Sequence, residues 1–208
     1  MKYSRINQKS DADYNRRTKY MKTIRIKVYK FNELSQDAQN KAIDKLRDIN
    51  VDFDWWEPII EGFDEILHHQ GFEDAEIYFS GFYSQGDGLC FDAKINLDKF
   101  ELTNQEKRIS KLINNNYIDN FYIAKNSYSN HYSHEKTRYI DYYEITHENI
   151  NKALNSISTH LESKRLEYCK KFYSQLEEYY NELRSDEAII ETIEANDYDF
   201  LANGELFN

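Results

Sequence analysis

The densest group of chemically capable side chains lies in residues 130–139, whose sequence is NHYSHEKTRY. In an extended strand alternate side chains share a face, and here that rule would group four of them: Tyr132, His134, Lys136 and Arg138. A metal-independent ribonuclease needs an imidazole to move a proton, cations to hold the phosphate, and a ring to stack on a base. The spacing therefore predicts a catalytic set of His134, Lys136 and Arg138, with His131 as the second proton carrier and Tyr132 as an RNA contact.

Other interpretations of the same segment stay open. Tyr128 or Tyr139 could carry the second proton instead of His131, and a solvated edge strand would show the same mixture of side chains without any chemistry. A zinc site on His131 and His134 is a weaker reading, because residues three apart point to opposite faces of a strand and no nearby cysteine completes a ligand shell. We therefore expect neither a metal nor another cofactor.

A second candidate site is the loop at residues 84–88, which reads Ser-Gln-Gly-Asp-Gly. Its two glycines permit positive φ angles, so its backbone N–H groups could form a concavity that binds an anion. Gln85 and Asp87 would then contact the RNA. The alternative is an ordinary hairpin turn in which these two side chains only satisfy backbone groups.

Charge is distributed unevenly along the chain. The net charge is −10, yet residues 1–30 carry ten Lys or Arg against two Asp, which gives +8, and residues 177–205 carry ten carboxylates against Arg184, which gives −9. The basic arm at residues 1–22 is a candidate RNA-binding segment, and its cations include Arg16, Arg17, Lys19 and Lys22. The alternative is that basic and acidic ends pair with each other inside the fold.

Composition indicates a folded cytoplasmic protein. The 208 residues are 40% hydrophobic, enough for a real core, and Cys90 and Cys169 lie too far apart to suggest a metal motif or an oxidising compartment. No apolar stretch approaches the roughly 20 residues that a membrane-spanning helix needs. We expect no membrane contact.

The hydrophobic periods predict an α+β domain over residues 23–208, with one antiparallel sheet of about four to five strands packed by helices. Strands are expected at 23–30, 76–83, 89–97, 117–128 and 136–145. Helices are expected at 35–50, 56–70, 104–115 and 185–195, with one long C-terminal helix from 146 to 183. A helix of that length would exceed a small sheet, so part of it could pair with a partner or form a homodimer.

Two stretches carry a resemblance to a known group of proteins: residues 77–88 (IYFSGFYSQGDG) and residues 185–200 (SDEAIIETIEANDYDF). They resemble a family of tailed-phage and prophage accessory proteins, as do the FNELS segment at 31–35 and the HYSHE segment at 131–135. The resemblance implies a small phage protein used against host defences such as CRISPR. It transfers no catalytic residue, and the basic arm departs from the family pattern.

Two functional hypotheses follow. In the first, a phage anti-defence protein binds RNA and cleaves it without a metal. In the second, a non-catalytic inhibitor or adaptor binds a host defence protein complex through its long helix and acidic tail.

Overall fold

The computed structural model describes residues 25–114, 121–126, 132–143 and 148–207, and these fall into two compact units. The larger unit spans residues 46–192, and the smaller one combines the described parts of residues 1–45 and 193–208. Five α-helices lie in the described residues: α2 (Gln36–Lys45), α3 (Glu57–His69), α4 (Asn104–Asn114), α5 (Glu148–Leu183) and α6 (Asp186–Ala195). The α+β class is confirmed.

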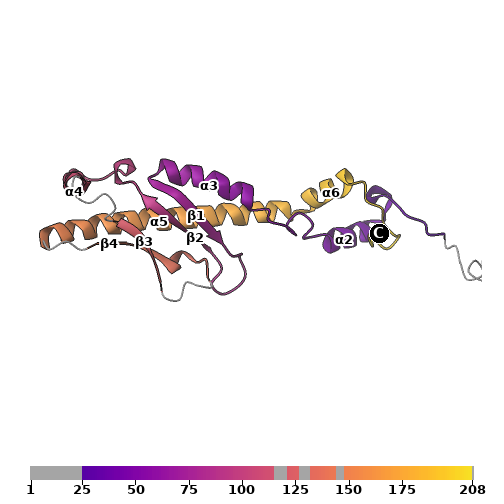
Figure 1. Cartoon of the computed structure of the whole chain (residues 1–208). Coiled ribbons are helices and arrows are strands. Elements are labelled where there is room, and N and C mark those ends of the chain that lie inside the picture. Colours follow the sequence, from indigo (N-terminus) through magenta and orange to yellow (C-terminus); the bar gives the residue numbers. More distant parts are fainter. Residues whose placement is uncertain (1–24, 115–120, 127–131, 144–147, 208) are drawn as a thin grey trace, which may run out of the picture. The chain divides into compact units, whose positions relative to one another are not determined.

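The larger unit is built on two antiparallel strand pairs rather than on one sheet (Figure 1). β1 (Phe72–Phe79) pairs with β2 (Leu89–Ile95), and β3 (Phe121–Lys125) pairs with β4 (Arg138–Tyr142). Strands β2, β3 and β4 lie within the ranges expected from alternation, whereas β1 begins and ends four residues before the expected range of 76–83. The expectation of one sheet of four to five strands is wrong for the described residues.

At the outer edge of β4, side chains of α5 occupy the position that a further strand could take. The N–H of Ile140 donates to Glu162 Oε2 at 3.0 Å, and Ser158 Oγ donates to the Ile140 carbonyl at 2.9 Å. Arg165 donates to the Arg138 carbonyl at 2.8 Å. These hydrogen bonds satisfy backbone groups at the edge of β4, so the groups are not available to pair with a neighbouring strand.

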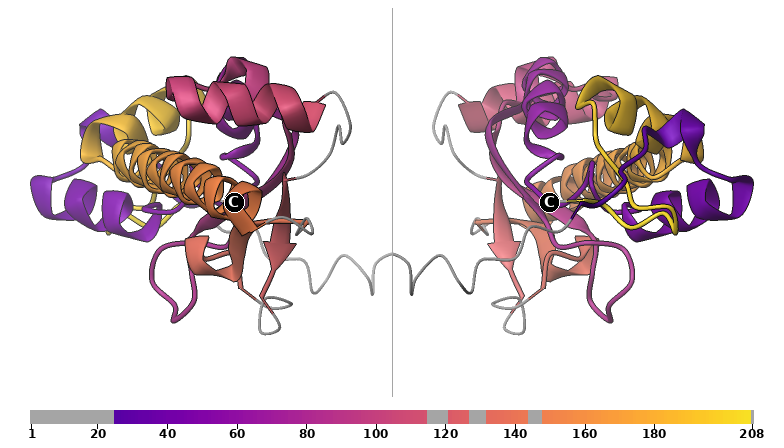
Figure 2. Two further views of the ribbon diagram at one scale, coloured as in Figure 1. Left: turned by 90° about the vertical axis from the view of Figure 1, so that its left-hand side faces the viewer. Right: turned by 90° about the vertical axis from the view of Figure 1, so that its right-hand side faces the viewer.

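The long helix predicted over residues 146–183 is confirmed as α5, a helix of 36 residues. Its buried side chains recur every three or four residues, and they include Leu154, Ile157, Leu161, Arg165, Phe172 and Leu176. This period keeps one face turned toward the strands. Figure 2 views α5 almost end-on, with α4 on one side of it and the β3–β4 pair on the other.

The core of the larger unit forms where α3 and α5 cover the β1–β2 pair. The rings of Phe63 on α3 and Phe172 on α5 stack with centroids 4.0 Å apart. Phe72 and Phe91, on the two strands, are fully buried and meet edge-to-face at 5.1 Å. Such contacts between large rings hold the helices at a fixed position over the strands.

The smaller unit corrects one expectation from the sequence. A strand was expected over residues 23–30, but in the described part only Tyr29 makes a ladder contact, an isolated bridge to Phe200. In the described structure, the alternating residues 25–28 have no partner strand to pack against, and Ile26 is accordingly 55% exposed. Lys30 instead pairs with Asp197 and Asp199, each at 2.9 Å. At Lys30, therefore, the basic and acidic ends of the chain do meet.

Candidate functional site: an aromatic pocket beside a locked turn

The segment around His134 does not form the extended strand that the ribonuclease hypothesis assumed. Residues Glu135–Thr137 form a 3-10 turn, η4, with His134 as its N-cap. Nδ1 of His134 lies 3.2 Å from the Lys136 N–H, from which it accepts in the neutral ring, and 3.1 Å from Glu135 Oε2, to which it can donate when protonated. The turn interrupts the alternation, so Tyr132, His134, Lys136 and Arg138 do not share one face.

Arg138 is used inside the fold. Its side chain is only 7% exposed, and its Nε donates to Asp92 Oδ1 at 2.6 Å. Its guanidinium also lies over the ring of Tyr78, 5.3 Å from the centroid, while Lys125 pairs with the second oxygen of Asp92 at 3.0 Å. Asp92 thus links β2 to both strands of the neighbouring pair, and it neutralises the cation that was expected to hold a phosphate.

Arg165 is an organising residue that sequence reasoning missed. It is fully buried, and it donates to both oxygens of Glu162 at 2.7 and 2.8 Å. It also donates to the carbonyls of Glu135 and Arg138 at 2.9 and 2.8 Å. The signal was present in the sequence, because Arg165 occupies an apolar position in the period of α5.

The loop at residues 84–88 closes on itself. The carboxylate of Asp87 accepts from the N–H groups of Tyr83 at 3.0 Å and Ser84 at 2.6 Å. These are the donors an external anion would have needed, so the concavity is already filled by the protein's own carboxylate. The Gln85 side chain is exposed.

The structure brings this loop and the His134 segment together. Gly86 has φ +93°, and a Cβ at that position would strike the ring of Tyr132. A Cβ on Gly88 would lie 2.9 Å from the Cα of His134. Two segments that the sequence analysis treated separately are therefore parts of one surface, and glycine is needed for their close approach. His131 and the arm residues Arg16, Arg17, Lys19 and Lys22 lie outside the described residues.

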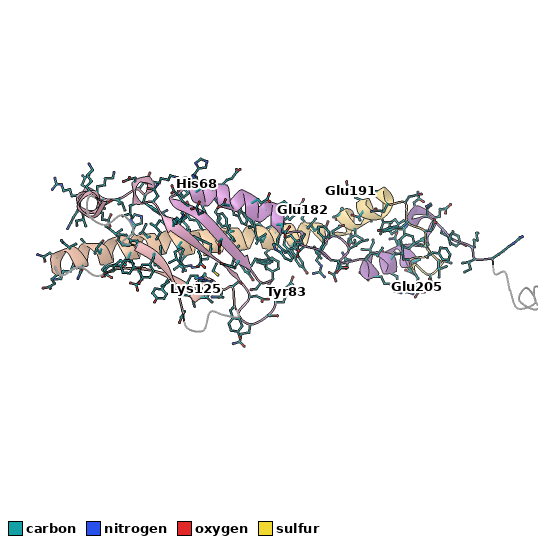
Figure 3. All side chains as sticks on the ribbon, in the orientation of Figure 1. His68, Tyr83, Lys125, Glu182, Glu191 and Glu205 are labelled. Carbon is teal, nitrogen blue, oxygen red and sulfur yellow. The ribbon has the colours of Figure 1, made fainter. Side chains whose placement is uncertain are left out.

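The turn that Asp87 locks forms one wall of an aromatic pocket of about 300 Å³. We call it the aromatic pocket; it is lined by Trp55, Trp56, residues 79–83 and Tyr180. Figure 3 labels Tyr83 in the loop between β1 and β2, where its side chain projects and is 74% exposed. The lining residues come from three stretches of the chain, which is why periodicity alone did not reveal the pocket.

The aromatic rings of the pocket are fixed by one another. Trp55 is buried, and its ring lies 5.5 Å from that of Tyr180 and 6.4 Å from that of Phe82, measured between centroids. Tyr173 packs on Phe82 at 5.3 Å, and its hydroxyl donates to the Gly81 carbonyl at 3.3 Å. The wall formed by the turn is therefore braced from α5.

A second pocket, lined by Glu106, Ser156, Thr159, His160, Ser163, Lys164 and Glu167, lies between α4 and α5 in the described part of the chain. Within the described residues, no three His, Cys, Asp or Glu side chains are placed to hold a metal ion. No helix of the described chain has the length and apolar character to cross a membrane.

Comparison with known proteins gives one match. Neither a curated protein nor a solved structure matches the chain. A family model described as "Domain of unknown function (DUF8835)" matches residues 55–186, which is more than half of the chain and contains every residue of the aromatic pocket. The chain therefore belongs to the DUF8835 family.

Proposed function

We propose that this protein is a phage anti-defence protein that acts without catalysis, by binding a host defence protein at the aromatic pocket. The observation that carries the proposal is the pocket itself, where two tryptophans and Tyr180 lie next to the highly exposed Tyr83. Trp and Tyr side chains supply a disproportionate share of the binding energy in protein interfaces. The pocket's volume of about 300 Å³ is at the small end of the range of ligand pockets, which leaves room for a side chain of a partner.

The positions of the expected ribonuclease residues favour binding over cleavage. Arg138 is neutralised by Asp92, and Asp87, which was expected as an RNA contact, is engaged by its own turn. His134 caps η4 and no longer shares a face with Arg138. A cleavage site would need these groups to be turned toward one phosphate, and each of them is instead bonded to a neighbour within the fold.

The phage resemblance supports the anti-defence role. One of the two motifs that carry the resemblance, residues 77–88, also forms a wall of the aromatic pocket. The FSGFYSQGDG stretch at residues 79–88 supplies Phe79, Phe82 and Tyr83 to the lining. It also supplies Asp87 and Gly86, which shape the turn. A role in binding would therefore account for this motif, in addition to common descent with the phage proteins.

The test is protection of an infecting phage. The chain is expressed in host strains that each carry one defence system, CRISPR–Cas or restriction–modification, and the efficiency of plating is measured. We expect Tyr83→Ala and Trp56→Ala to lower the protection given by the parent chain at least tenfold, on the order expected when an interface anchor is removed. Tyr143→Ala, which removes an exposed tyrosine from outside the pocket, is the matched control.

The ribonuclease hypothesis makes the opposite prediction. There, His134→Ala would abolish protection, and the two pocket variants would retain it. Equal amounts of folded protein are verified by immunoblotting and by circular dichroism. If His134→Ala alone removes protection, the proposal of a non-catalytic binding protein is wrong.

RNA binding without cleavage is a second candidate. Tyr132 is 50% exposed, and the Lys136 side chain in the same segment is also exposed. An accessible ring and an accessible cation are the groups that bind a single-stranded base and a phosphate. A raised 260/280 nm absorbance ratio of the purified chain that nuclease lowers, and that Tyr132→Ala and Lys136→Ala abolish, would support it.

A further inference from the structure

Three carboxylates neighbour the lining residues of the aromatic pocket in sequence, and one cation, Arg184, contacts the ring of Tyr180. Asp54 precedes Trp55, Glu57 follows Trp56, and Glu177 lies one helical turn before Tyr180 on α5. All three side chains are exposed, and within the described part of the chain none of these carboxylates forms an ion pair. Carboxylates next to apolar ring faces repel anions and favour a cationic partner.

The same field acts on Tyr173, which braces the pocket wall. Burial raises the pKa of the Tyr173 phenol, and the carboxylates of Glu177, Asp87 and Glu135 raise it further. These acidic groups come from α5, from the locked turn and from η4. Negative charge therefore surrounds Tyr173, whose ring packs on Phe82 in the pocket wall.

One ring of the pocket already holds a cation. The guanidinium of Arg184 lies over the ring of Tyr180, 5.0 Å from its centroid, and Asp48 holds this arginine with a contact of 2.9 Å to Nε. A guanidinium between an aromatic face and a carboxylate is the arrangement that an incoming arginine would repeat.

We propose that the aromatic pocket binds an arginine side chain from a basic segment of the partner protein. This inference rests on the proposed function and specifies the chemical group of the partner that the pocket recognises. Arginine fits better than lysine, because its planar guanidinium can stack on Trp and Tyr faces while it donates to flanking carboxylates. Nucleic acid does not fit this pocket, because the carboxylates around it would repel phosphates.

The chain provides its own reporter of pocket occupancy. It contains two tryptophans, Trp55 and Trp56, and both line the pocket. Tryptophan emission of the full chain is therefore followed during titration with the peptide acetyl-Gly-Arg-Gly-Arg-Gly-amide. The control peptide replaces both arginines by citrulline, which keeps the planar shape but has no charge.

We expect the arginine peptide to change the emission and to bind about tenfold more tightly than the citrulline peptide, from the lost cation–π and ionic contacts. Glu177→Gln and Asp54→Asn should each weaken the arginine peptide about threefold at low salt. Glu148→Gln, at the opposite end of α5, should leave its affinity unchanged.

The outcomes separate this inference from the proposed function. Equal binding of both peptides would overturn the arginine assignment, because it would show that the pocket does not require a charged side chain, while the binding role survives. If the arginine peptide binds but Tyr83→Ala and Trp56→Ala retain phage protection, the chemistry stands and the proposed function fails. Emission that depends on protein concentration without peptide would assign the pocket to a second copy of this chain, and would overturn the inference.

Discussion

Arg138 and Asp92 lie on different strand pairs and meet with Nε 2.6 Å from Oδ1, in a site where the arginine side chain is only 7% exposed. An ion pair with one side chain this well buried is costly to break from one side, since the remaining charge loses its main partner. The contact therefore holds the β3–β4 pair against β2, and it identifies Arg138 as a structural residue.

Arg138→Met should lower the free energy of unfolding by about 3 kcal/mol, because it leaves Asp92 with only its exposed contact to Lys125. For a chain of this size that corresponds to a fall of roughly 6–12 °C in the melting temperature. Urea titration followed by circular dichroism measures the effect. Arg138→Met combined with Asp92→Leu should recover part of the loss, and a double variant as unstable as the sum of the single ones would show that the pair is not coupled.

Arg165→Met should destabilise the protein by a similar amount, about 3 kcal/mol or more, because Glu162 and the carbonyls of Glu135 and Arg138 lose their shared donor. Lys164→Met, one position earlier on the exposed face of α5, is the control and should cost little. Thermal melts of the two variants side by side provide the measurement. Equal melting temperatures would contradict the role assigned to Arg165.

Gly86→Ala should destabilise the locked turn by about 1–2 kcal/mol, since φ is +93° and the new methyl group would strike Tyr132. Gly62→Ala is a matched control in α3, where a Cβ meets nothing within 4 Å. That change should instead stabilise the helix by about 0.5–1 kcal/mol. Chemical denaturation gives both values, and the same sign for the two variants would refute this account of the turn.

Glu106 should make the stability depend on pH in the acidic range. Burial favours its neutral form, but hydrogen bonds from Thr103 and Ser156 outweigh burial and lower the pKa of this carboxyl below its ordinary value of 4.5. A lowered folded-state pKa means that the stabilisation is present above the unfolded-state value and is lost as the pH falls through the folded-state value.

Melting temperatures measured from pH 6 to pH 3 should therefore fall less steeply for Glu106→Gln than for the parent chain. The parent should be the more stable of the two at pH 6, with the difference shrinking below about pH 4.5. Glu101→Gln, an exposed neighbour, is the control and should follow the parent curve. Parallel curves for Glu106→Gln and the parent would show that Glu106 is not the source of the pH dependence of the melting temperature.

Periodicity predicted the helices and the two strand pairs because those elements are dictated by which face of each segment is buried. The helical period of α5 and the residue alternation over 89–97 are both visible without tertiary information, although the structure buries three successive residues at the start of β2, Leu89, Cys90 and Phe91. How the strands combine could not be read this way. Whether β4 takes another strand depends on Ser158 and Glu162 lying opposite its edge, a contact between segments about 20 residues apart.

The candidate site was predictable only in part. The sequence marked the 84–88 loop and the His134 segment as unusual, and the structure places them against each other. It could not show that η4 interrupts the strand, nor that Arg138 turns toward Asp92. The aromatic pocket was missed because Trp55 and Tyr180, 125 residues apart in sequence, contribute to one wall only after α5 has packed.

The α5 side chains that hydrogen-bond to the β4 edge also limit where residues can be inserted into α5 or deleted from it. Ser158, Glu162 and Arg165 occupy successive turns of α5, and each forms a hydrogen bond with a specific backbone group of β4 or of η4. Inserting one residue just before Ser158 would rotate the preceding part of α5 by about 100° relative to these three, and an insertion among them would break their spacing. Insertions and deletions among relatives should therefore be absent from residues 157–166 of α5 and should occur in the loops of the protein.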